Sequence, residues 1–408
     1  MKTNFKLLMF LIAVHSAAYA QVVPAATGPA TLPPGGRSLE YAVRYAQNAQ
    51  FGTSFSTLQT STASGSLTFI NASERTPFTA EYSGGYTWTL TGPAFESGQF
   101  QRLFMTQAID WKKWKLMFSN DASYLPQSPI TGFSGIPGIG EPIGVTPTAP
   151  ASSQSILNLS THVVENNASG ILEYDLSKAT TVSIGGGSVL LRYPDGDGLE
   201  TNTESGNATL VHALNARDSL SATYQILNFT YPDYLITFET NSGLIGLTRR
   251  WTRNLTTEIA AGPEMLSSSV VPNSLDVTVN ANINYLLRFS SLSLSYIRGT
   301  NGGSGYLFGA KVNSAIGNFQ KEFGTEWTLG VTGGYQQTDD LADNGSTRGI
   351  FAGTEVTRRF GRDLIIFTSY TATTQSSTAA LPTNALNQLI NMISFGVGYS
   401  PIPKRLRQ

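Results

Sequence analysis

The chain has 408 residues, a formal net charge of −1, 13% charged residues and no cysteine. Nothing in the near-neutral charge points to nucleic acid as a partner, and the absence of cysteine fits chance as well as an oxidising compartment. A soluble domain of average composition carries about twice this fraction of charged residues, so the composition points away from an ordinary soluble protein.

Residues 1–20 have the features of a secretory signal peptide. Lys2 and Lys6 form a positive start, residues 7–14 are apolar, and Ala18-Tyr19-Ala20 is a cleavage site of the A-x-A type. We therefore expect cleavage near Ala20. The later sequence contains no apolar run of the ~20 residues that a membrane-spanning helix needs.

Residues 21–38 are rich in Pro, Gly and Ala and predict a flexible periplasmic segment. From Leu39 onward, apolar and polar residues alternate in short segments, and 275–289 is the clearest of them. A period of two is that of a β-strand with one apolar and one polar face. The segments are rich in Thr, Val, Tyr and Gly, which favour strands or weaken helices.

The connections between these segments alternate between short and long. The short ones carry basic residues such as Lys113, Arg217 and Arg253, and the longer ones carry acidic residues such as Glu96 and Asp340. Two ends that differ in this way are typical of an outer-membrane barrel. We predict an all-β fold, a closed antiparallel transmembrane β-barrel over 39–400 with roughly 18 strands, or 16 as the alternative, and a basic tail at 401–408. A soluble β-sandwich or β-helix is the competing fold, but it would leave the difference between the ends accidental.

The longest interruption spans residues 125–166. Its Gly and Pro residues suit tight turns, and Ile136, Ile139 and Ile143 recur at a regular spacing. We expect this loop to pack inside the lumen, with Glu141, Ile136 and Ile139 at a constriction. The alternative is a surface loop that caps the mouth.

The pattern as a whole resembles a Gram-negative outer-membrane β-barrel of porin-like size. The last segment, Phe395-Gly396-Val397-Gly398-Tyr399, resembles the C-terminal signal of that class, although Ser400 to Gln408 follow it. The loop at 125–166 begins after the fifth predicted strand, where general porins have their constriction loop. The resemblance implies an outer-membrane location and partners that are lipid, lipopolysaccharide, periplasmic chaperones and the barrel-assembly machinery, and it leaves homo-oligomer formation open.

The polar faces of the predicted strands supply candidate pore-lining residues of both signs. They are Glu81, Lys115, Glu258, Asp276, Arg288, Glu326 and Glu355, with Glu40, Arg44, Asp121, Glu264, Lys311 and Arg359 beside them. A polar inner face holds water. The alternative for each residue is an ion pair that only stabilises the wall.

Other motifs are weaker. Asp195 and Asp197 alternate as Ca²⁺ ligands do, but the spacing of an EF-hand loop is incomplete, and a plain turn is the simpler interpretation. His212 near Asp218 and Ser219 raises the hypothesis of a hydrolase, but no nucleophile motif accompanies it. We therefore predict no enzyme activity, metal or cofactor.

The predicted function is a porin-like channel for passive diffusion of small hydrophilic solutes. The alternatives are an export barrel for a surface polysaccharide or similar polymer, and a structural or adhesive barrel.

Overall fold

A computed structural model describes residues 36–52, 57–91, 98–126, 162–194, 198–303, 307–341, 345–378, 388–401 and 404–406. The strands are β1 (Arg37–Gly52), β2 (Leu58–Asn71), β3 (Phe78–Thr91), β4 (Gly98–Asp110), β5 (Trp114–Pro126), β6 (His162–Asp175), β7 (Thr180–Arg192), β8 (Thr201–Ala213), β9 (Asp218–Tyr231), β10 (Ile236–Arg250), β11 (Leu255–Ser268), β12 (Ser274–Leu286), β13 (Ser290–Asn301), β14 (Ala310–Phe323), β15 (Trp327–Asp340), β16 (Ser346–Phe360), β17 (Leu364–Ser377), β18 (Gln388–Tyr399) and β19 (Lys404–Leu406).

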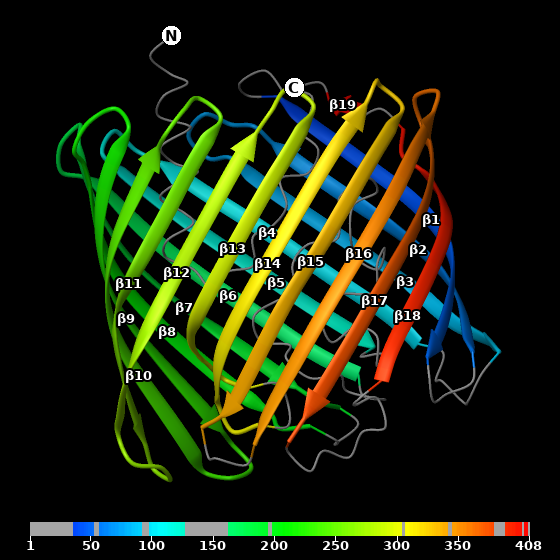
Figure 1. The fold of residues 1–408 in the computed structure, drawn as a ribbon. Helices are drawn as coiled ribbons and strands as arrows, with labels where there is room; N and C mark the ends of the chain where they lie inside the picture. The colour runs from blue at the N-terminus through cyan, green and yellow to red at the C-terminus, as the bar shows by residue number, and fades with distance from the viewer. Residues whose placement is uncertain are drawn as a thin grey trace.

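Strands β1 to β18 form one closed antiparallel barrel (Figure 1), which confirms the predicted fold and its 18 strands. Each strand pairs with its sequence neighbours, and β18 closes the ring by pairing with β1 from Val43↔Tyr399 to Gly52↔Ile390. Closure pairs the backbone groups that an open sheet would expose at its edges.

The end of the chain lengthens this closure. After β18, the short strand β19 pairs with the first residues of β1, from Arg37↔Leu406 to Leu39↔Lys404. The residues after Tyr399 therefore include a strand on the same edge of β1, and β1 itself begins two residues before the predicted start at Leu39.

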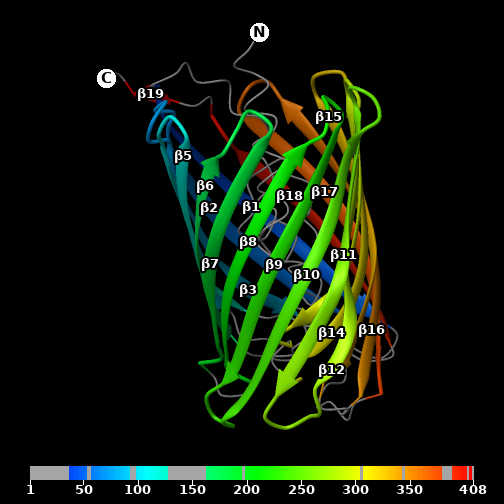
Figure 2. The same cartoon turned by 90° about the vertical axis from the view of Figure 1, so that its left-hand side faces the viewer.

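The two ends of the barrel differ, as the connections predict. Short turns join the strands at the end that also carries β19 and the start of β1 (Figures 1 and 2). We call it the turn end, and we call the opposite end the loop end. The connection between β5 and β6 covers 127–161, so it is shorter on both sides than the predicted loop at 125–166.

The outer face of the wall is apolar and the inner face is mostly polar. On β1, Tyr41, Val43 and Tyr45 are exposed on the outside, whereas Arg44 and Asn48 between and beyond them are buried on the inside. Aromatic side chains gather at the turn end, where the exposed tryptophans are Trp111, Trp114, Trp251 and Trp327. An apolar band with aromatic residues at its border is the surface of a membrane-spanning barrel.

In the part of the chain that the structure describes, no helix has the length and apolar character needed to cross a membrane.

Candidate functional site: the lumen and its inturned hairpin

The wall is interrupted at the loop end, between β12 and β13. Their pairing runs from Leu286↔Ser291 at the turn end to Val279↔Arg298. Beyond this pair, toward the loop end, β12 remains paired with β11 as far as Leu266↔Ser274. Strand β13 remains paired with β14 as far as Asn301↔Ala310. The ends of β13 and β14 are thus freed from β12 and turn into the barrel. We call residues 299–303 and 307–311 the inturned hairpin.

The inturned hairpin reaches the inner face of strands on the other side of β12. A side chain at Gly302 would lie 3.1 Å from the Phe229 ring on β9 and 3.2 Å from Thr201 on β8. The Tyr231 hydroxyl donates a hydrogen bond to the Gly302 carbonyl and accepts one from the Gly309 amide. The chain therefore crosses inside the barrel from β13 to β8 and β9, and glycine at 302 permits the close approach.

Apolar packing holds this crossing in place. Five residues of the inner faces of β9, β10 and β11 form a buried cluster against which Phe308 and Leu341 pack: Leu227, Phe229, Tyr231, Phe238 and Leu266. The Phe308 ring centroid lies 5.2 Å from that of Tyr231 and 4.9 Å from that of Tyr234. Each large apolar side chain that is removed from water contributes ~1.5–3 kcal/mol, so the hairpin is a packed part of the fold.

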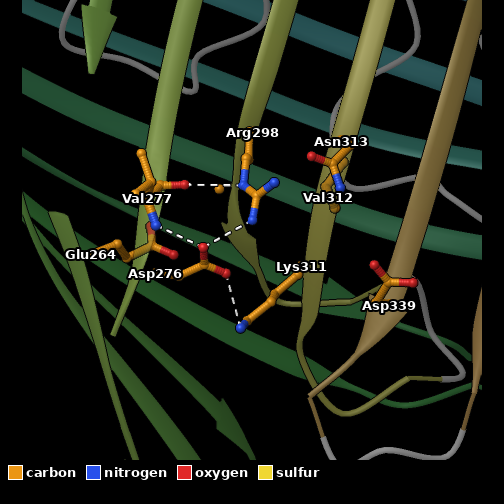
Figure 3. A pocket seen from close by; sticks show the side chains of 9 residues that line it. Glu264, Asp276, Val277, Arg298, Lys311, Val312, Asn313 and Asp339 are labelled. Carbon is orange, nitrogen blue, oxygen red and sulfur yellow. Dashed lines mark hydrogen bonds and ion pairs between the residues drawn. The ribbon is translucent and has the colours of Figure 1, made fainter. Parts of the chain in front are cut away.

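A polar cluster fastens the base of the hairpin across the interruption. Asp276 on β12 accepts a hydrogen bond from Arg298 Nη2 at 2.9 Å and lies 3.0 Å from Lys311 Nζ (Figure 3). Arg298 Nε also donates to the Val277 carbonyl at 3.2 Å, and the Thr300 hydroxyl donates to Glu264 on β11. The cluster encloses a cavity of only about 40 Å³, so it acts as an anchor rather than as a solute pocket.

Several predicted pore-lining residues do lie on the inner face. The strands of the wall include four of them: Glu81, Lys115, Glu258 and Glu355. In each case either an adjacent residue in the strand is exposed on the outer face, or the residue itself is buried on the inner face. Lys115 lies 4.0 Å from Asp110 at the turn end. Asp276 also starts on the inner face, but its contacts are those of the anchor.

Arg288 and Glu326 are corrections to the predicted set. Strand β12 ends at Leu286, so Arg288 lies in the following turn, exposed and with its guanidinium carbon 4.8 Å from the Phe289 ring centroid. Glu326 lies in the turn before β15, where it is exposed and 3.6 Å from Arg358. The strand alternation stops short of both turns, so neither residue lines the wall.

Glu141, Ile136 and Ile139 lie outside the described residues, as do Asp195 and Asp197. The described part of the chain holds no group of three or more side chains suited to a metal ion.

The residues of the hydrolase hypothesis have other partners. His212 Nδ1 hydrogen-bonds to the Thr180 hydroxyl at 2.9 Å, and Asp218 lies 3.6 Å from Arg249 and accepts a bond from Asn215.

Sequence reasoning missed Arg102 and Glu165. Arg102 on β4 makes a two-pronged pair with Asp121 on β5, with N–O distances of 2.9 and 2.6 Å. The predicted loop at 125–166 includes Glu165, but β6 begins at His162 and places this residue on the wall.

The inturned hairpin was missed too. The glycines at 302, 303 and 305 stand beside Tyr306-Leu307-Phe308. An apolar connection of this kind does not suit free exposure to water, and this was the signal that could have found it.

No family model and no curated protein matches the chain. Among solved structures, OpdQ of Pseudomonas aeruginosa is 12% identical with a TM-score of 0.47, and the match covers 90% of this chain and 99% of that one. OccAB2 of Acinetobacter baumannii is 10% identical with a TM-score of 0.48, covering 91% and 98%. The FrpB iron transporter of Neisseria meningitidis (F5-1 variant) is 8% identical with a TM-score of 0.44, covering 85% and 64%. Likeness at this level carries no conclusion about transport.

Proposed function

We propose that the protein is an outer-membrane channel through which small hydrophilic solutes diffuse passively. The observation that carries the proposal is a closed 18-stranded wall with an apolar outer face and a mostly polar inner face. Barrels of 16–18 strands are wide enough for an aqueous channel, and polar groups that line the wall remain hydrated there.

The inturned hairpin supports the restriction to small solutes. It brings backbone and apolar side chains across the loop end, to β8 and β9. A solute that enters from this end has to pass beside the hairpin, because the hairpin is fixed by packing and by the Asp276 anchor. We propose that this element sets an upper limit on solute size.

The constriction predicted from Glu141, Ile136 and Ile139 remains a second proposal. It is supported by the position of the 127–161 connection directly after the fifth strand.

We also propose a location and partners, which the signal in the sequence and the apolar outer face of the barrel support. We infer export by the signal at residues 1–20, insertion in the outer membrane with the turn end toward the periplasm, and contact with lipid and lipopolysaccharide. Chaperones and the assembly machinery would act before insertion. The size of the purified complex distinguishes a single barrel from a homo-oligomer.

Planar-bilayer recording on the purified protein tests the channel. We expect stable open steps, and larger steps from a variant without residues 132–144 if that segment narrows the lumen. Absence of steps from both proteins would contradict the proposal and favour a structural or adhesive barrel. Conductance that is blocked by a polysaccharide on one side only would instead favour polymer export.

A further inference from the structure

We propose that the channel selects cations over anions. The inference rests on the proposed channel function and goes beyond it, because it names the charge class of the solutes. Its basis is the sign of the charges along the whole inner wall, as distinct from any single acidic site.

The inner wall is dominated by carboxylates. The pairing register and the exposed outward neighbours show which residues of the described strands point inward, and the two residues at each strand end are left out because they border the turns and loops. The acidic residues on the inner face are then Glu40, Glu81, Asp121, Glu165, Glu173, Glu258, Glu264, Asp276 and Glu355. The basic residues there are Arg44 and Arg102, and Lys115, the second residue of β5, lies on the same face directly opposite Glu173.

All three cations are already matched by an anion, since Lys115 interacts electrostatically with Asp110 and Glu173. Arg102 makes the two-pronged pair with Asp121 and also faces Glu81 and Glu165, which interact electrostatically with it. Arg44 interacts with Glu355 and places its guanidinium carbon 3.6 Å from the Phe367 ring centroid. Arg102 thus stands among three carboxylates on β3, β5 and β6.

The two cations of the anchor do not make the inner wall neutral. Arg298 and Lys311 both bind Asp276 at the base of the inturned hairpin. Their two positive charges offset Asp276 and the neighbouring Glu264, so the seven remaining carboxylates of the inner face still exceed Arg44, Arg102 and Lys115.

The carboxylates also follow the path of a solute. Glu81 and Glu258 lie near the turn end, Asp121 lies near the middle of its strand, and Glu165 and Glu264 lie toward the loop end. A lumen with low-dielectric walls and one sign of charge concentrates ions of the opposite sign, and acidic linings favour cations in channels.

The structure also changes the balance of charge that the sequence alone suggests. The sequence indicates a lumen of mixed sign when Arg288, Lys311 and Arg359 are counted on the wall. Arg288 lies in a turn, Lys311 belongs to the anchor, and Arg359 is next to the last residue of β16. None of the three therefore offsets the carboxylates in the middle of the wall.

The test is the reversal potential of the purified protein in a planar bilayer with a KCl gradient. We expect potassium to be more permeable than chloride, with a preference that weakens as the salt rises from about 0.1 to about 1 M, because the screening length falls from ~10 to ~3 Å over this range. Open steps with chloride preference would overturn this proposal and leave the channel itself intact. Absence of any steps would overturn both.

Substitution of carboxylates on the inner face tests whether these residues set the preference for cations. The triple variant Glu81→Gln, Glu165→Gln and Glu258→Gln should lower the ratio of potassium to chloride permeability several-fold. The matched control is Glu204→Gln, Glu239→Gln and Glu326→Gln, three carboxylates on the outer face or in a turn, and it should keep the ratio of the unchanged protein. Open steps from each variant show that it has folded, and equal ratios for the two triple variants would refute the assignment.

Discussion

At the scale of single residues, Tyr231 connects the inturned hairpin to the wall. Its side chain is fully buried, and its hydroxyl serves both the Gly302 carbonyl and the Gly309 amide. A phenylalanine keeps the ring contacts with Phe238 and Phe308 but leaves two backbone groups without that partner.

We expect Tyr231→Phe to lower the free energy of unfolding by about 1–3 kcal/mol and to make the open current noisier, because the hairpin is held less firmly. Urea-induced unfolding in lipid and bilayer recording measure the two effects. Tyr224→Phe is the matched control, since the Tyr224 hydroxyl bonds Asn241 on the exposed outer face. Equal currents and equal stability for the two variants would show that Tyr231 does not anchor the hairpin.

A second residue-scale effect concerns Gly262, opposite Gly243 on the neighbouring strand. A Cβ at Gly262 would lie 1.7 Å from the Gly243 carbonyl oxygen, so Gly262→Ala forces the backbones of β10 and β11 apart. We expect a loss of about 1–3 kcal/mol in urea unfolding, as for overpacked cores. Gly206→Ala is the control, because no heavy atom lies within 4 Å of its Cβ, and a similar loss there would contradict the explanation.

The charged residues show what the sequence alone reveals of the site. Alternation assigns Glu81, Lys115, Glu258 and Glu355 to the inner face, because a period of two fixes the face of every residue once one is known. It fails for Arg288 and Glu326, which lie just outside the strand ends.

The alternation of apolar and polar residues does not predict which charged residues form ion pairs. The pairing of Arg102 with Asp121, and of Asp276 with Arg298 and Lys311, depends on the register between strands. A single sequence does not carry that register, so these contacts could be found only in the structure.

At the scale of elements, the closure between β1 and β18 is the strand pairing that brings together the two ends of the barrel sequence. The chain has no cysteine, so one introduced pair reports on the register without background. Tyr45 is paired with Val397, and paired Cα atoms in antiparallel strands lie within the range that a disulfide spans.

We expect Tyr45→Cys with Val397→Cys to cross-link under oxidation, seen as a change in mobility on a non-reducing gel. Tyr45→Cys with Phe395→Cys should cross-link far less, because Phe395 lies opposite Gln47 and its distance from position 45 is then the longer diagonal one. The opposite ranking would mean that the barrel closes in another register.

The sequence predicts the strands well where they run regularly in the wall. It does not predict the place where two paired strands bend into the barrel. The strand number and the order of short and long connections followed from alternation and turn residues. The bend of β13 and β14 into the barrel did not, because it depends on contacts of Gly302 with Thr201 and Phe229. These residues lie far away in the sequence, and alternation treats each strand by itself.

At the scale of the whole molecule, the apolar outer band, the closed wall, the polar inner face and the inturned hairpin are the features on which the proposed channel rests. In this proposal the width comes from the strand number, the limit on solute size from the inturned hairpin, and the charge preference from the carboxylates of the inner face. Each property is set by different residues, so each can be changed separately.

The single-channel conductance of a hairpin replacement tests the proposed channel most directly. Asn301 and Ala310 are paired, so residues 302–309 can be replaced by Asn-Gly, which closes a two-residue hairpin. We predict open steps from the unchanged protein and clearly larger steps from the replacement, since the crossing to β8 and β9 is gone. Equal steps from the two proteins, or no steps from either, would contradict a channel that is narrowed by this hairpin.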